Sequence, residues 1–108
     1  MEDSKFRKAL VLFKNQEAGI LEEIEKGYRF TYKDSFIKSY HSISVSLPKE
    51  QIIFEDGALF PFFLGLLPEG WYLELVSKIM KIDKDNKFEL LLATCEDTIG
   101  AVTIKEIQ

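Results

Sequence analysis

The sequence predicts an α+β fold: a small antiparallel sheet, built from an N-terminal meander and a C-terminal strand, with about three short helices in the second half of the chain. Three observations predict this fold. Short β-favouring runs separated by turn residues fill the first third of the chain. Apolar residues recur at helical spacing in the second half. Residues 101–107 then return to a β-favouring run, which we expect to complete the sheet.

Two β-favouring runs open the chain and predict its first hairpin. Residues 6–14 and 18–24 carry these runs, and Asn15 and Gln16 between them predict a tight turn. A second turn is predicted to end at Gly27, because glycine adopts positive φ at little cost. The first third of the chain is therefore predicted to be an antiparallel meander.

The clearest strand pattern covers residues 28–32. Tyr28, Phe30 and Tyr32 alternate with polar residues, which places the three rings on one face of a strand. Aromatic rings beside basic residues also occur on sheets that stack nucleic-acid bases. Because the whole chain is acidic, we expect these rings to pack on the protein core instead.

Residues 33–57 give a weaker pattern. In residues 43–47, apolar residues alternate with serines until Pro48, which indicates a short strand or an extended segment. Residues 52–54 indicate either another short strand or a buried extended segment. Residues 55–57 indicate a turn or the start of a helix.

Three helices are predicted in the second half. Residues 58–67 are strongly apolar, with Pro61 placed to lie in a first helical turn and Pro68 placed to end the helix. Residues 70–82 predict the second helix, and Gly70 allows a sharp change of direction before it. The third helix is predicted from Asn86 to Ala93 or Thr94, because Asn86 and Glu89 have the spacing of a capping box. Gly100 is predicted to break the chain before the final strand.

The predicted helix 70–82 has more apolar surface than one core requires. Its apolar residues cover an arc of about 200° when each residue is rotated by 100°. A surface helix that packs on its own core uses an arc of somewhat more than about 100°. The surplus indicates a second contact surface on this helix.

Length and charge exclude several classes of protein. The chain has 108 residues, with 14 basic and 18 acidic side chains and a formal net charge of −4. We expect one domain, residues 1–108, and no direct contact with nucleic acid, since phosphate binding requires a clustered positive surface. The longest apolar run spans ten residues, 58–67, whereas a membrane helix needs about 20. With a single cysteine and no signal-peptide pattern, we expect a cytoplasmic protein that makes no membrane contact.

No catalytic set of residues is recognisable. The chain has one histidine, His41, and one cysteine, Cys95, which excludes a His/Cys metal cluster and predicts neither metal nor cofactor. Residues 65–70 have the glycine spacing of a phosphate-binding loop. However, Trp71 occupies the position of the required lysine, and Tyr72 that of the required Ser or Thr. We therefore expect a binding module rather than an enzyme.

The segment Ala58–Trp71, which contains the sequence Leu-Leu-Pro-Glu-Gly-Trp, resembles the N-terminal subdomain of bacterial HipA-type Ser/Thr kinase toxins. Further stretches agree with the family in order and spacing: residues 18–21, 28–32, 44–48, 88–93 and 96–102. The family usually has an acidic or polar residue and then Asn before Leu-Leu-Pro-Glu-Gly. This chain has Leu64 and Gly65 there, so a polar contact from these positions is not expected. The resemblance covers nearly the whole chain and implies one domain of this type.

The resemblance also implies a function. HipA-type toxins are several times longer and continue into a kinase where this sequence ends at Gln108, so we expect no kinase activity from this chain. It is similar to the free-standing version of the subdomain, the HipS-type antitoxins of three-gene HipBST modules. That similarity implies an antitoxin that binds and silences a separate HipT-like kinase toxin. A HipB-like DNA-binding repressor is the implied third partner in a larger complex.

A candidate partner-binding site surrounds the only tryptophan. Trp71 lies in the first turn of the predicted helix 70–82, and Trp is enriched among residues that dominate binding energy in protein interfaces. The candidate residues are Leu67, Pro68, Glu69, Gly70, Trp71 and Tyr72. The alternative is that Trp71 packs inside its own core, on Tyr40, Phe60 or Phe63.

Two other functions stay open from the sequence. The chain could complete a split HipA-type kinase as a structural subunit without inhibiting it. It could also be an unrelated small binding domain. The presence of a partner kinase that lacks its own Leu-Pro-Glu-Gly segment would favour the antitoxin and the structural subunit over the unrelated domain.

Overall fold

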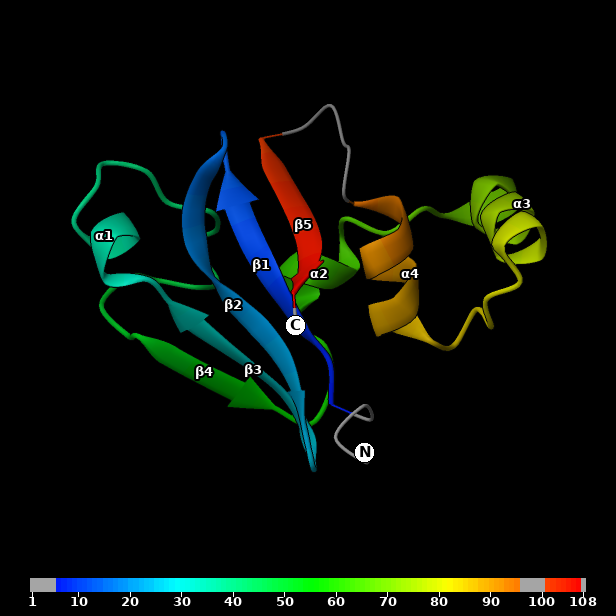
Figure 1. Cartoon of the computed structure of the whole chain (residues 1–108), viewed down its shortest axis with the longest axis horizontal. Coiled ribbons are helices and arrows are strands. Elements are labelled where there is room, and N and C mark those ends of the chain that lie inside the picture. Colours follow the sequence, from blue (N-terminus) through cyan, green and yellow to red (C-terminus); the bar gives the residue numbers. More distant parts are fainter. Residues whose placement is uncertain (1–5, 96–100, 108) are drawn as a thin grey trace.

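A five-stranded antiparallel sheet organises the chain, with strand order β4-β3-β2-β1-β5 (Figure 1). The computed structural model describes residues 6–95 and 101–107. The strands are β1 (Lys8–Phe13), β2 (Gln16–Ile24), β3 (Gly27–Tyr32), β4 (Ile53–Asp56) and β5 (Val102–Ile107). The helices are α1 (Asp34–Ile37), α2 (Pro61–Leu64), α3 (Gly70–Met80) and α4 (Lys87–Thr94). The predicted α+β class and its antiparallel sheet are confirmed.

The predicted N-terminal meander is confirmed, with one turn displaced. Lys14 and Asn15 have φ values of 50° and 70°, as a two-residue hairpin turn requires, and Gln16 already pairs with Phe13. The turn thus lies one residue earlier than predicted. Gly27 starts β3 with a φ of +149°, and a Cβ atom there would lie 2.0 Å from the carbonyl oxygen of Asp56. No other residue fits this position without moving β4.

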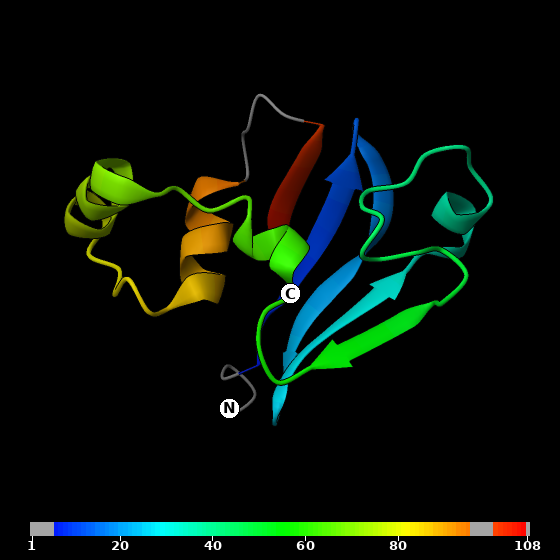
Figure 2. The same cartoon turned by 180° about the vertical axis from the view of Figure 1, so that it is seen from behind.

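One face of the sheet carries the core. Figure 2 shows α2 in front of that face, and α4 lies beside β5. The alternation predicted in β3 is confirmed, because Phe30 and Tyr32 are buried and Tyr28 is half-buried against the ring of Phe88. Besides Phe30, the side chains with no exposed surface come from strands and helices alike: Ala9, Val11, Ala18, Leu21, Phe36, Phe63, Leu90, Leu91 and Ile104.

The segment between β3 and β4 differs most from expectation. Helix α1 was not predicted, and it places Phe36 in the core, stacked on Tyr32 with ring centroids 5.9 Å apart. The strand alternative for residues 43–47 is wrong, because Ser44 bends the chain. Its carbonyl accepts a hydrogen bond from the Leu47 amide, and its hydroxyl accepts one from the Ser46 amide. For residues 52–54, the strand alternative is the correct one, although the observed strand β4 covers Ile53–Asp56.

The helices predicted in the second half are present, but two of them are shorter. Pro61 occupies the first turn of α2, as predicted, yet this helix ends at Leu64 and residues 65–67 continue as turns. Helix α3 ends at Met80 because Lys81 adopts a left-handed conformation with a φ of 58°. Helix α4 begins as predicted, with the Asn86 side chain accepting a hydrogen bond from the Glu89 amide. The predicted final strand is β5, whereas Gly100 lies outside the described residues.

Candidate protein-interaction site

Helix α3 lies apart from the sheet and the other helices, at one end of the long axis of the molecule (Figure 1). None of its eleven residues is buried. Leu73 and Val76 are half-buried on one side, and the large apolar residues on the other side are exposed. The surplus apolar surface predicted for this helix is therefore present and faces outward.

The chain before α3 sets the direction of the helix. Glu69 is extended and precedes Gly70, whose φ of +58° turns the backbone into the first helical residue. A Cβ atom on Gly70 would have no neighbour within 4 Å, so glycine is used here for its backbone conformation and not for space. Pro68 restricts the residue before it to extended conformations. The backbone conformation of this turn sets the direction in which Trp71 projects.

The chain after α3 is tied back to the helix. The Ser77 hydroxyl donates a hydrogen bond to the carbonyl of Ile82, and the Ile82 amide bonds to the Ser77 carbonyl at 3.0 Å. Lys84 forms an ion pair with Glu74 at 2.6 Å, which raises the pKa of the Lys84 ammonium. The C-terminal end of α3 is therefore tied to the chain that follows it, although the helix buries none of its residues.

Trp71 is 76% exposed, and its ring contacts the neighbouring Tyr72 ring with centroids 6.1 Å apart. The alternative that Trp71 packs in the core is wrong. Of the three partners considered, Tyr40 is itself fully exposed, and Phe60 and Phe63 pack on each other inside the core. The exposed apolar residues of α3 are Trp71, Tyr72, Leu75, Ile79 and Met80.

The six candidate residues form one continuous segment, but they do not all face solvent. Glu69, Gly70, Trp71 and Tyr72 are exposed. Leu67 is half-buried and packs against the core, so it supports the turn and does not contribute an exposed side chain. Sequence reasoning assigned no role to Leu75, Ile79 and Met80, although the wide apolar arc was the signal that could have identified them.

A hollow lies along the flank of α3. It has a volume of about 360 Å³ and is lined by Trp71, Glu74, Leu75, Ser77 and Lys78. Its lining combines apolar side chains with one acidic and one basic group. A hollow of this kind on an exposed helix suits a protruding side chain of a protein partner better than a buried small ligand.

Among the residues that the structure describes, the titratable side chains do not form a recognisable catalytic set. Burial raises the pKa of the Cys95 thiol, which favours the unreactive protonated form, as expected for a buried structural cysteine. His41 lies in a loop with its ring 5.0 Å from that of Phe13.

Among residues 6–95 and 101–107, no three His, Cys, Asp or Glu side chains are grouped so that they could hold a metal ion. Within the same residues, no helix has the length and hydrophobicity that a membrane crossing requires.

Comparisons with known proteins agree with the sequence resemblance. The family model described as HipA N-terminal domain matches residues 9–105. An uncharacterized protein of Haemophilus influenzae is 34% identical over 100 residues, which are 93% of this chain and 92% of that protein. The solved structure of the N-terminal domain of HipA toxin aligns with a TM-score of 0.75 and 28% identity, covering 94% of this chain and 93% of that chain. The resemblance noted for Ala58–Trp71 is therefore confirmed over nearly the whole chain.

Proposed function

The chain belongs to the HipA N-terminal domain family, and on that premise we propose that it is an antitoxin that binds and inhibits a separate HipT-like Ser/Thr kinase toxin. The family places the chain in the context of HipA-type toxin–antitoxin systems. The matched domain is the N-terminal one and not the kinase, so this chain is a binding protein and not an enzyme in the proposal. A HipB-like DNA-binding repressor is the third partner, and the chain itself contacts neither nucleic acid nor membrane.

The observation that carries the proposal is the exposure of Trp71 on a well-positioned helix. Burying an exposed indole is strongly favourable, and Trp residues often dominate the binding energy of an interface. Here the ring is 76% exposed and follows a turn that fixes its direction. The ring contacts the Tyr72 ring and lines a hollow with Glu74 and Lys78, so a partner meets an apolar surface bordered by charges of both signs.

The proposed mechanism is occlusion of the kinase. Trp71 inserts into the cleft of the kinase, with Pro68, Glu69, Gly70 and Tyr72 around it, while Leu67 holds the turn against the core. Because the turn and the helix are already formed, little conformational entropy is lost on binding. The chain then inhibits by occupying space and needs no chemistry of its own.

A second candidate function rests on the same exposed helix. In a longer kinase of this family, an apolar face such as that of α3 would be covered by the rest of the polypeptide. The chain could therefore complete a split HipA-type kinase as a structural subunit without inhibiting it. The two functions have different effects on kinase activity: the antitoxin lowers it, whereas the structural subunit maintains or raises it.

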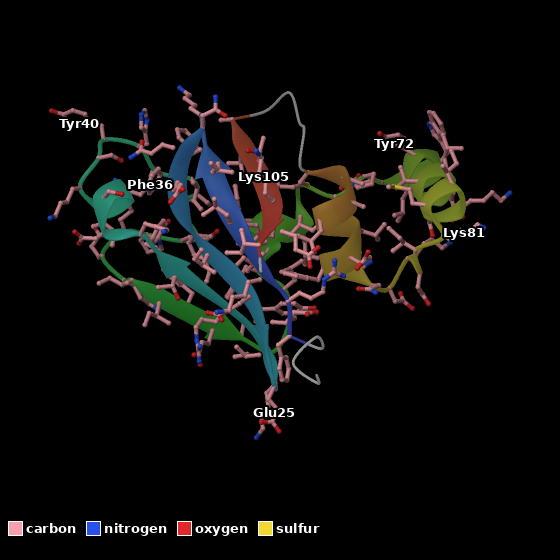
Figure 3. All side chains as sticks on the ribbon, in the orientation of Figure 1. Glu25, Phe36, Tyr40, Tyr72, Lys81 and Lys105 are labelled. Carbon is pink, nitrogen blue, oxygen red and sulfur yellow. The ribbon has the colours of Figure 1, made fainter. Side chains whose placement is uncertain are left out.

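The deciding experiment is a growth-rescue assay. A HipT-like kinase encoded beside this chain is expressed alone, with the chain, and with its Trp71→Ala variant. Tyr40→Ala is the matched control, because Tyr40 is a fully exposed aromatic at the opposite end of the molecule from Tyr72 (Figure 3). We expect rescue by the original chain and by Tyr40→Ala, but not by soluble Trp71→Ala. Absence of rescue by the original chain, or increased toxicity, would favour the structural subunit.

A further inference from the structure

Helix α3 carries a charge pattern that matches a second copy of itself. Glu74 lies in the N-terminal half of the helix and Lys78 in the C-terminal half, four residues later. Residues at this spacing lie on one side of a helix, so both charges flank the outward stripe formed by Trp71, Leu75 and Ile79. The helix therefore presents an apolar stripe with an acidic and a basic group along the same edge.

We propose that two copies of this chain associate through α3, with the two helices antiparallel about a twofold axis near Leu75 and Val76. In that arrangement, Glu74 of each copy lies opposite Lys78 of the other, so the same ion pair forms twice. A parallel twofold pairing would instead place the Glu74 and Lys78 edges of the two helices on opposite sides of the contact, where neither pair forms. Antiparallel helices also place the positive end of one dipole beside the negative end of the other. The charge order along α3 thus selects the antiparallel pairing.

The apolar residues fit the same arrangement. Antiparallel pairing brings the C-terminal half of one helix, which carries Ile79, beside the N-terminal half of the other, which carries Trp71. The hollow of about 360 Å³ runs from Trp71 to Lys78, over both halves of the helix, and can accept an apolar side chain of the other copy. Ile79 is 67% exposed and Trp71 is 76% exposed in the single chain, so both can lose exposed surface on association. Their burial supplies the main attraction, and the ion pairs set the direction.

Lys78 and Glu74 differ in whether they already form an ion pair within the single chain. Within the part of the chain that the structure describes, Lys78 takes part in no ion pair. Glu74 pairs with Lys84, but both side chains are largely exposed, so this pair holds Glu74 only weakly. A carboxylate can accept hydrogen bonds from two ammonium groups at once. Glu74 is therefore available to a lysine of a second copy.

The helix is short, and its length sets the strength of the contact. Eleven residues span about 16 Å. A contact limited to one helix of this length stays below the roughly 1,200–2,000 Å² of a standard stable interface. The dimer is therefore weak and reversible, in the micromolar to millimolar range of dissociation constants.

The weak dimer has a consequence that rests on the proposed function. The dimer contact and the kinase contact both use Trp71, so the two complexes exclude each other. The free chain then keeps its apolar helix covered until the kinase competes for it. Only this consequence depends on kinase binding, whereas self-association itself does not.

Sedimentation equilibrium of the purified full chain, over micromolar to millimolar concentrations, tests the proposal without any kinase. We expect the average mass to rise from that of one chain towards that of two. Ile79→Asp should remain a single chain throughout, and the matched control Val45→Asp, changed at a fully exposed loop residue, should behave like the original chain. Circular dichroism verifies that each variant is folded. A single chain at all concentrations, or unchanged association by Ile79→Asp, would overturn the proposal.

Charge reversal tests the antiparallel arrangement. Glu74→Lys and Lys78→Glu each place like charges opposite each other, and each should weaken association by about tenfold. The double variant restores both pairs in reversed order and should regain most of that loss. Lys105→Glu on β5 and Glu50→Lys before β4 are exposed controls with the same changes of charge. A double variant that associates no better than the single variants would overturn the antiparallel pairing.

Adding a HipT-like kinase separates this proposal from the proposed function. If the kinase binds, the mixture should contain one chain per kinase and lose the dimer of the chain. A dimer that persists within the kinase complex would overturn the mutual exclusion. If the kinase does not bind at all, the proposed function fails, and the sedimentation results for the chain alone still decide the self-association.

Discussion

The ring of Phe30 on β3 packs against the ring of Phe63 on α2, with centroids 5.6 Å apart, and both side chains are fully buried. This contact joins the sheet to the helical turn that leads into Pro68 and Gly70. The position of α3 therefore depends on a core contact at one end and on a backbone turn at the other. The exposed helix can be presented to a partner because the segment before it is held by the core.

Replacing Phe63 should destabilise the protein more than replacing the adjacent Phe62. Phe63→Ala removes a fully buried ring, and we expect a loss of about 3–5 kcal/mol in the free energy of unfolding. Phe62→Ala is the matched control, because Phe62 is only half-buried and should cost clearly less. Urea unfolding followed by circular dichroism measures both. Equal losses for the two variants would contradict the central position of Phe63.

Trp71→Ala should weaken binding to the kinase while leaving the stability of the fold nearly unchanged. Its side chain is mostly exposed, so we expect the free energy of unfolding to change by no more than about 0.5 kcal/mol. Binding to the kinase should weaken by about 30-fold, since truncating an interface tryptophan typically costs about 2 kcal/mol or more. Calorimetric titration of the kinase with each variant measures this change. Tyr40→Ala serves as the exposed aromatic control and should bind like the original chain.

Gly70→Ala tests whether the turn before α3 depends on backbone conformation. Gly70 has a φ of +58°, where a residue with a Cβ atom costs roughly 1–2 kcal/mol. We expect lower stability or a displaced α3, with weaker inhibition of the kinase. Gly65→Ala is the control, because Gly65 has a φ of −68° and an added Cβ would make only ordinary contacts at 3.5 Å. A Gly70→Ala chain with unchanged melting temperature and unchanged inhibition would show that this conformation is not required.

These contrasts also explain what could be predicted from the sequence. The β3 alternation of Phe30 and Tyr32 and the cap at Asn86 are local patterns, and both were predicted correctly. The exposure of Trp71 was open, because a helix with a wide apolar arc can turn either part of that arc inward. In the structure, Leu73 and Val76 form the half-buried side of the helix. Which side of α3 is half-buried depends on where the helix lies relative to the rest of the chain.

Helix α1 shows why other parts could not be predicted. It has four residues and no side-chain cap, so no local pattern marks it. Its Phe36 side chain is fully buried, with its ring against those of Tyr32 and of Phe13 in β1, a contact that no local pattern reveals. The strand alternative for residues 43–47 was wrong because a local pattern was misleading. The alternation of serine with apolar residues imitates a strand, but serine hydroxyls that bond to nearby amides bend the chain instead.

Removing the side-chain cap of α4 should lower stability by a measurable amount. The Asn86 side chain accepts a hydrogen bond from the Glu89 amide, and replacing such a cap with Ala costs about 1 kcal/mol. Asn86→Ala should therefore lower the melting temperature, while Asn86→Asp retains an acceptor oxygen and should stay close to the original chain. Differential scanning calorimetry compares the two. If Asn86→Asp is as destabilised as Asn86→Ala, the hydrogen bond is not the source of the effect.

Tyr32 should make the stability of the fold fall at high pH. Burial raises the pKa of the Tyr32 phenol to about 12, and its hydroxyl donates a hydrogen bond to the carbonyl of Leu47. In the unfolded chain a tyrosine loses its proton near pH 10, so between about pH 10 and 12 the folded state binds more protons than the unfolded state. The free energy of unfolding contributed by Tyr32 is therefore fully present below about pH 10 and is lost as the pH rises towards 12.

The Tyr32→Phe variant isolates this contribution. At pH 7 it should be less stable than the original chain, because the buried Leu47 carbonyl loses its donor. Between pH 10 and pH 12 its stability should fall less steeply, so the difference between the two proteins should shrink. The remaining slope includes Tyr28, whose pKa is also raised by burial and by the nearby Glu23. Urea unfolding at intervals across this range measures both slopes, and parallel curves for the two proteins would rule out Tyr32 as the titrating group.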